Sequence, residues 1–287
     1  MKLYLIHTII SLIIAGSLLS SCSPKDEGAK KQLEMARVAL DNNQFEQAKN
    51  YLDSIKTLYP KAFEEQRNAF ALLDTVRRAE NDYIIRQCDS LVAVNQPKVD
   101  SMKKAFHYMI DKNYYDAGIF VPIEGFNDGR LQITTLRSGV KENSGTLYLE
   151  SVYIGGNQMH NQLKVALKDG TSAESLPVND DGLNFRFTNL GKQYEIIKFE
   201  GNALGEVAQF IASNQDKPIT LTLKGNNTYS YQLPPVAKKG VKQSTDLSAA
   251  MICIDSLKEE KNKAEFRNYK LTEKQNQQAE REKDETN

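Results

Sequence analysis

The sequence predicts an α+β protein in which helical segments at both ends enclose a mostly antiparallel β region. Apolar residues recur at helical spacing up to about residue 112 and again from about residue 243. Between these parts, short runs of β-branched and aromatic residues are separated by turns rich in Gly, Asn and Asp. Lys plus Arg equals Asp plus Glu at 37 each, so no overall field favours nucleic acid as a partner.

The first residues have the layout of a secretory signal. Lys2 precedes an apolar run from Ile9 to Leu19, and small residues follow it. The run is too short for a membrane-spanning helix, which needs about 20 apolar residues. We therefore predict a signal peptide over residues 1–21 and a polar tether over residues 22–28.

Two motifs at this point resemble those of anchored bacterial proteins. Leu19-Ser20-Ser21-Cys22 resembles the lipobox of bacterial lipoproteins, which implies that Cys22 carries palmitate and becomes the mature N-terminus. The triplet Lys25-Asp26-Glu27 resembles the export signal of Bacteroidota lipoproteins. The resemblance implies an outer-membrane lipoprotein of the cell envelope, either displayed on the surface or facing the periplasm. An ordinary signal peptide with a chance cysteine is the alternative.

Residues 29–112 are predicted to form a helical domain that begins with a hairpin. Asn42-Asn43 interrupts the helical pattern at a turn, and Pro60 ends the second helix. The hairpin resembles one tetratricopeptide repeat, although Gln32 stands where a large aromatic is usual. A single repeat cannot bury its own apolar face, so another segment must cover it.

After the hairpin, two more helices are expected in this domain. The first is long and runs from about Lys61 to Asn95, with an apolar stripe along one side and charges along the other. Pro97 then reads as the first-turn proline of a shorter helix that carries Phe106 and Ile110.

Residues 113–235 are predicted to form an antiparallel sheet or a sandwich with one short helix against it. Because side chains alternate along a strand, Tyr148 and Tyr153 should point to opposite faces. The helix is expected over residues 204–212. The strands are expected at 119–121, 131–136, 146–154, 163–167, 183–187, 194–199, 219–223 and 228–233.

The chain returns to helix over residues 236–271, and residues 272–287 are predicted to be a polar tail that is frayed or disordered. Leu247, Met251 and Ile254 lie on one side of this helix and need a partner. We expect the helix to pack back on the N-terminal helices, which would leave the sheet region as an insertion. A helix lying on the sheet is the alternative.

Beyond Cys22, the cysteines are Cys88 and Cys253, and both fall on predicted apolar stripes. If the two helices face each other, an oxidising compartment would allow a disulfide between them. The alternative is two separate buried thiols that act as small hydrophobes.

A short motif, Asp followed by Ser or Thr and an apolar residue, recurs along the predicted helices. It resembles the O-glycosylation sequon of exported Bacteroidota proteins, in which the hydroxyl carries the glycan. Amphipathic helices also place Asp and Ser beside apolar positions, so a purely structural origin stays open. The candidate hydroxyls are those of Ser54, Thr75, Ser90, Ser101 and Ser256.

Catalytic and metal-binding patterns are not found in the sequence. His107 and His160 belong to no zinc spacing, and His107 is expected to be a half-buried packing residue on a helix. The sequence contains no Gly-x-Ser-x-Gly elbow and no phosphate loop, so we predict no cofactor. Flat aromatic platforms for sugar are weakly indicated, because the chain lacks Trp and several tyrosines fall at core positions.

These observations favour a non-enzymatic, lipid-anchored envelope protein that mediates protein interaction or assembly. Its partners would be the membrane, through the lipid, and another envelope protein or a glycan. A ligand- or glycan-binding lipoprotein of an uptake or adhesion system is the first alternative, and a cryptic hydrolase is the second.

Overall fold

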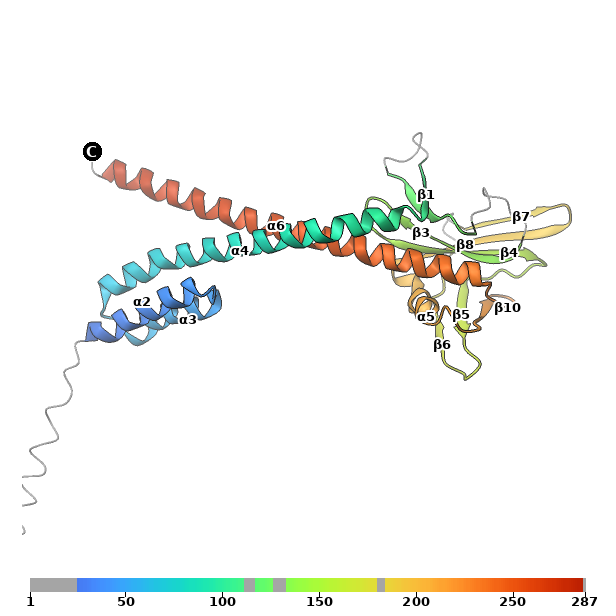
Figure 1. The fold of residues 1–287 in the computed structure, drawn as a ribbon, viewed down its shortest axis with the longest axis horizontal. Helices are drawn as coiled ribbons and strands as arrows, with labels where there is room; N and C mark the ends of the chain where they lie inside the picture. Colours follow the sequence, from blue (N-terminus) through green and yellow to red (C-terminus); the bar gives the residue numbers. More distant parts are fainter. Residues whose placement is uncertain (1–24, 111–116, 126–132, 180–183, 286–287) are drawn as a thin grey trace, which may run out of the picture. The chain divides into compact units, whose positions relative to one another are not determined.

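The computed structural model describes residues 25–110, 117–125, 133–179 and 184–285 (Figure 1). It is an α+β protein with N-terminal helices, two antiparallel sheets and a C-terminal helix, which confirms the predicted fold class. The chain divides into two compact units. The helical unit comprises Met1–Cys88 and Glu260–Asn287, and the sheet unit comprises Asp89–Glu259. Among the described helices, none combines the length and the hydropathy required to cross a bilayer.

The helical unit begins with a helix hairpin, as predicted. Helix α2 (Lys25–Asp41) and helix α3 (Phe45–Leu58) are joined at Asn43, whose positive φ of 57° suits the asparagine side chain. Small residues on both helices are fully buried, so the two backbones approach closely; they are Ala29, Ala36 and Ala48. Residues 25–28, predicted as tether, form the first turn of α2 instead.

The C-terminal helix packs back on the N-terminal helices, as predicted. Helix α4 (Phe63–Lys103) meets helix α6 (Pro235–Glu285) in the helical unit through polar side chains. The Asn81 amide donates to Asn268 at 3.0 Å, and its oxygen accepts from Arg267 at 2.9 Å. The predicted frayed tail is wrong up to residue 285, because contacts such as Lys274 with Asp74 at 3.0 Å hold α6 against α4.

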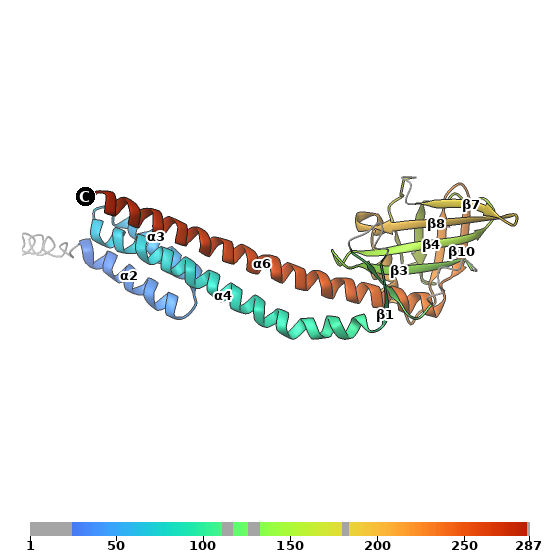
Figure 2. The same ribbon diagram turned by 90° about the horizontal axis from the view of Figure 1, so that it is seen from above.

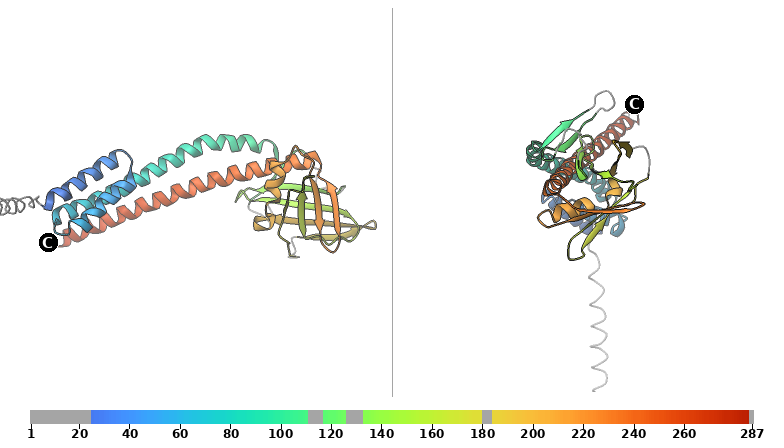
Figure 3. Two further views of the ribbon diagram at one scale, coloured as in Figure 1. Left: turned by 90° about the horizontal axis from the view of Figure 1, so that it is seen from below. Right: turned by 90° about the vertical axis from the view of Figure 1, so that its right-hand side faces the viewer.

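The sheet unit contains two antiparallel sheets whose inner faces share one core with α5 (Val207–Ser213) and the start of α6 (Figure 3, left). The expected strand 119–121 and the final hairpin are confirmed. The six-stranded sheet has the order β1 (Phe106–Met109), β2 (Ile119–Pro122), β3 (Thr135–Lys141), β4 (Leu147–Gly155), β8 (Lys192–Glu200) and β7 (Phe185–Asn189). The four-stranded sheet has the order β10 (Thr228–Gln232), β9 (Thr220–Lys224), β5 (Gln162–Ala166) and β6 (Ser172–Glu174), and η1 (Gly201–Leu204) precedes α5.

The predicted short helix after Pro97 is wrong. Pro97 lies inside α4, which ends at Lys103, and Phe106–Met109 forms strand β1. Phe106 pairs with Pro122 and joins a second core with Leu247 of α6, so tertiary pairing overrides the helical spacing.

The start of α6 therefore lies against the sheet, while its end packs on α4. The alternative, in which the C-terminal helix lies on the sheet, is thus correct for the first part of α6.

We predict that Asn81→Ala lowers the free energy of unfolding of the helical unit by about 1–3 kcal/mol, because it removes the two hydrogen bonds that the Asn81 side chain makes with Asn268 and Arg267. The exposed residue Gln87 of the same helix is the control, since Gln87→Ala should change stability by less than about 0.5 kcal/mol. Urea unfolding followed by circular dichroism measures both. Equal stability of the two variants would contradict the account of the α4–α6 contact.

Candidate functional site: the outer face of the six-stranded sheet

The strand register places two rows of apolar side chains on the face of the six-stranded sheet that points away from the core. Leu149, Ile197 and Phe199 lie in the core, so the residues of opposite parity on β4 and β8 point outward. Cross-strand partners share a face of the sheet. The first outward row is Val152, Ile196 and Phe185, and the second is Ile154, Tyr194 and Phe187. We call these six residues the apolar rows.

The two phenylalanines of the apolar rows are open to solvent, whereas Val152 in the first row is buried. Phe185 is 61% exposed and Phe187 is 41% exposed. The Phe187 and Tyr194 rings are stacked with their centroids 5.0 Å apart and an angle of 2° between their planes. In Figure 2, strands β3, β4, β8 and β7 lie in front of the four-stranded sheet, so this view looks onto the outer face. Large exposed apolar side chains that adjoin one another indicate an interaction surface.

Charged residues continue the same face beside the apolar rows, and they are paired with one another. Arg137 lies 3.5 Å from Glu150 across β3 and β4. Glu200 accepts from Lys141 at 2.8 Å and lies 3.6 Å from Lys198. Partial burial would raise the pKa of Glu200, but these two ammonium groups outweigh it and hold that pKa below its ordinary value. The outer face therefore has an apolar part and an adjoining part of balanced charge.

The outer face of the four-stranded sheet has a different composition. Its outward rows consist almost wholly of polar and charged residues, as expected for a surface that faces water alone. Those rows are Gln162, Lys224 and Thr228; Lys164, Thr222 and Ser230; and Ala166, Thr220 and Gln232. The two sheets of one unit thus differ in what they expose, which singles out the six-stranded sheet as the candidate site.

The interior of the sheet unit also holds a buried hydroxyl–imidazole–carboxylate chain that the sequence did not reveal. His160 Nδ1 lies 2.7 Å from a carboxylate oxygen of Glu195, and its Nε2 lies 3.0 Å from Ser151 Oγ. This is the connectivity of a hydrolase triad. All three side chains are 0% exposed, so a substrate cannot reach the Ser151 hydroxyl in this conformation. The chain of hydrogen bonds acts here as a buried polar support.

Glu195 holds the loop before β5 against the sheet through hydrogen bonds to its backbone. Its carboxylate accepts from the backbone N–H groups of Gln158 at 2.9 Å, Met159 at 2.6 Å and His160 at 3.0 Å. Burial alone would raise the pKa of Glu195, but the hydrogen bonds from His160 and from these backbone groups lower it below the ordinary value. The signal in the sequence is a Glu at an inward position of a strand, since such a carboxylate requires partners.

The same network orients strand β7. The Arg186 guanidinium points inward, donates to the carbonyl oxygen of His160 at 3.0 Å and lies 3.9 Å from Glu195. Because side chains alternate along a strand, an inward Arg186 leaves Phe185 and Phe187 on the outer face. The buried network and the exposed rings of Phe185 and Phe187 are therefore two consequences of one strand orientation.

The possible disulfide between Cys88 and Cys253 is not formed in the structure. Both cysteines are free thiols, with Cys88 buried in the helical unit and Cys253 exposed in the sheet unit. The neighbours Met251 and Ile254 fill the buried side of α6, which turns Cys253 outward. The alternative of two buried thiols is correct for Cys88 alone. Cys22 lies outside the described residues.

All five candidate glycosylation hydroxyls lie on helices. Four of them are exposed, as a bulky glycan requires, and the fifth, Ser54, is half-buried and donates to the Asn50 carbonyl at 2.8 Å. The exposed ones are Thr75, Ser90, Ser101 and Ser256. The structure does not bring these residues together, and their modification stays a prediction.

The two histidines lie in different surroundings from those expected of a metal site. His107 is exposed on strand β1, so its predicted position as a half-buried helix residue is wrong. Within the described ranges, no group of three or more His, Cys, Asp or Glu side chains is placed to hold a metal ion. As expected, Tyr148 and Tyr153 point to opposite faces of the sheet, with Tyr153 in the core.

Comparisons with known proteins assign this chain to no family. No protein-family model matches it, and neither the curated proteins nor the solved structures contain a significant match.

We predict that Glu195→Gln lowers the free energy of unfolding of the sheet unit by about 3 kcal/mol at neutral pH, because an amide cannot accept all the bonds that the carboxylate receives. The folded-state pKa of Glu195 is lowered, so its contribution is present above the unfolded value of 4.5 and is lost as pH falls through the folded value.

Urea unfolding as a function of pH tests this prediction. The difference between the protein and its Glu195→Gln variant should shrink as the solution is acidified below pH 4.5. Glu206→Gln, at an exposed carboxylate of the same unit, is the matched control and should be close to neutral. A variant as stable as the control would show that the Glu195 network does not support the fold.

Proposed function

We propose that this chain is a non-enzymatic, lipid-anchored protein of the cell envelope that binds another protein through the outer face of its six-stranded sheet. The single observation behind this proposal is the pair of apolar rows, with Phe185 and Phe187 exposed on one sheet while the outer face of the other sheet is polar. Burial of such a surface against a partner would be favourable by about 25 cal/mol for each Å² removed from water.

A protein surface fits this face better than a glycan does. Sugars stack on flat aromatic rings but also require free hydrogen-bonding groups beside those rings. Here aliphatic residues such as Ile154 and Ile196 lie beside the rings, and the neighbouring charges are paired with one another. A protein partner with an apolar centre, and with a rim that carries both positive and negative charges, matches this arrangement. The stacked rings of Phe187 and Tyr194 keep the glycan-binding alternative as a second candidate.

The anchor of the proposed lipoprotein rests on the sequence. Leu19-Ser20-Ser21-Cys22 resembles a lipobox, and the described chain begins three residues after Cys22 at Lys25. Two or three acyl chains on one cysteine would be sufficient for stable membrane residence. The short connection would hold the start of α2 close to the membrane surface.

We expect metabolic labelling with palmitate to mark the protein, and Cys22→Ser to abolish the label, because Cys22 is the acceptor thiol of the proposed anchor. Cys88→Ser and Cys253→Ser are the matched controls and should keep the label. Labelling that persists after Cys22→Ser would place the lipid elsewhere, and no labelling of the original chain would refute the anchor.

The docking surface is tested with a photo-crosslinking phenylalanine analogue, benzoylphenylalanine, at position 187. The control carries the analogue at position 222, on the outer face of the four-stranded sheet. In cells that produce the protein, we expect a discrete protein adduct at position 187 and not at position 222. The additional substitution Phe185→Ser should weaken the adduct, because it removes a neighbouring apolar contact.

The outcomes separate the candidates. An adduct of twice the mass of the chain would identify the bound protein as a second copy and would support the proposal. An adduct that periodate converts back to the mass of the chain, and that yields peptides of this chain alone, would favour a glycan and contradict it. Equal adducts at both positions, or none at position 187, would also contradict a docking role for the apolar rows.

A further inference from the structure

A cavity of about 430 Å³ opens in the sheet unit beside strand β3, next to the β4 end of the apolar rows, because its lining residue Thr135 pairs with Val152. Strand β2 pairs with β3 only at Ile119 and Phe120, and Val121 and Pro122 have partners on β1 alone among the described strands. The cavity lies where β2 and β3 diverge, and the start of α6 closes one side of it. Its volume falls within the range of small-molecule sites, about 300–1,000 Å³.

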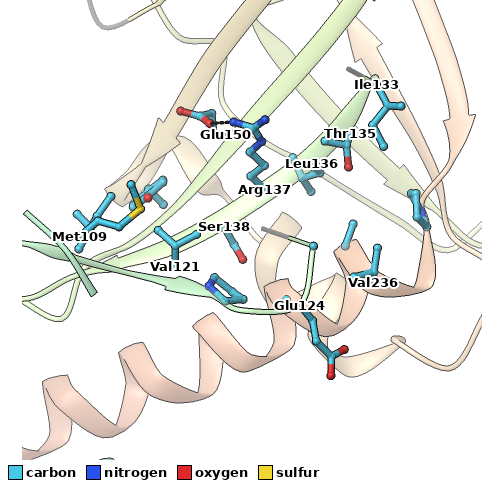
Figure 4. Close-up of a pocket in the computed structure, with 17 residues that line it drawn as sticks. Met109, Val121, Glu124, Ile133, Thr135, Leu136, Arg137, Ser138, Glu150 and Val236 are labelled. Carbon is cyan, nitrogen blue, oxygen red and sulfur yellow. Dashed lines mark hydrogen bonds and ion pairs between the residues drawn. The ribbon is translucent and has the colours of Figure 1, made fainter. Parts of the chain in front are cut away.

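The wall of the cavity is mainly apolar and is contributed by several elements (Figure 4). Met109 comes from β1, Val121 from β2 and Val236 from the first turn of α6. Ala237 and Gly240 of the same helix have little or no side chain, so the helix backbone itself limits the space. Ile133 and Val236 are 58% and 40% exposed, so both contribute apolar surface at the opening.

The charged groups of the wall already have partners within the protein. Arg137 points toward Glu150 in Figure 4, at 3.5 Å, and Glu124 accepts from Lys239 at 2.5 Å. The Ser138 hydroxyl lies 2.9 Å from that of Ser244. Burial and the nearby charge of Glu150 raise the pKa of Tyr148, so its hydroxyl stays neutral. Among the described residues of the wall, a charged ligand would therefore find no free counter-charge in return for its lost hydration.

We infer that this cavity binds an uncharged, hydrocarbon-rich small molecule or the hydrocarbon part of a lipid. The site goes beyond the proposed protein docking and uses different residues. Its apolar lining supplies the affinity, because each buried methylene of the ligand contributes about 0.8 kcal/mol. Its internally paired charges select against ionic ligands.

The experiment uses the full mature chain with Cys22→Ser, so that no detergent is required, and N-phenyl-1-naphthylamine as an uncharged fluorescent probe. We expect saturable binding at one site, and weaker binding of the anionic relative 8-anilinonaphthalene-1-sulfonate. Ile133→Asp and Val236→Asp each place a carboxylate in the wall and should weaken probe binding roughly tenfold or more. Both residues are exposed and belong to different elements, so failure of one variant to fold leaves the other as a test.

Two controls separate this site from the apolar rows and distinguish the sources of the ligand. Phe187→Ser should leave probe binding unchanged, since Phe187 does not line the cavity. Displacement of the probe by dodecan-1-ol but not by phosphatidylethanolamine vesicles would assign the site to a free molecule. Displacement by the vesicles would assign it to a lipid chain. Absence of saturable binding, binding unchanged by both aspartates, or loss of binding with Phe187→Ser would overturn the inference.

Discussion

The carboxylate of Glu195 is the constraint on which the arrangement of the sheet unit depends. It is fully buried and charged, and it collects bonds from three successive backbone N–H groups and from the His160 ring. A buried charge is tolerated only with such partners, so the loop and the strands around it have one acceptable register. Arg186 joins the same network from β7 and thereby turns Phe185 and Phe187 to the outside.

The apolar rows, the cavity and the proposed anchor fit one physical description of the protein. A polar network holds the interior of the sheet unit, while apolar surface is left on the outer face of one sheet and around a cavity beside its strand β3. A free monomer gains nothing from exposing these surfaces, so their burial by partners is the simplest reason for their presence. Proximity to a membrane through Cys22 would raise the local concentration of such partners.

The sequence predicted the fold class, the hairpin and most strands, because those depend on local periodicity and on turn residues. The sequence-based prediction failed where contacts between residues far apart in the chain determine the secondary structure. Phe106 has helical spacing but pairs with β2, and the polar end of α6 is helical through contacts with α4. The candidate site was harder to foresee from the sequence. Phe185 and Phe187 point outward because Arg186, between them, points inward and donates a hydrogen bond to the carbonyl oxygen of His160, which is distant in the sequence. Residues 1–24, 111–116, 126–132 and 180–183, with the expected turns at 127–129 and 180–182, lie outside the described residues.

Hydroxyl-radical footprinting of the unmodified protein, read by mass spectrometry, tests the central claim most directly. Three phenylalanines of the six-stranded sheet have the same intrinsic reactivity and differ only in the face on which they lie. The account predicts rapid oxidation of Phe185 and Phe187 and slow oxidation of the core residue Phe199. Equal protection of all three in the isolated protein would contradict an open apolar face on this sheet.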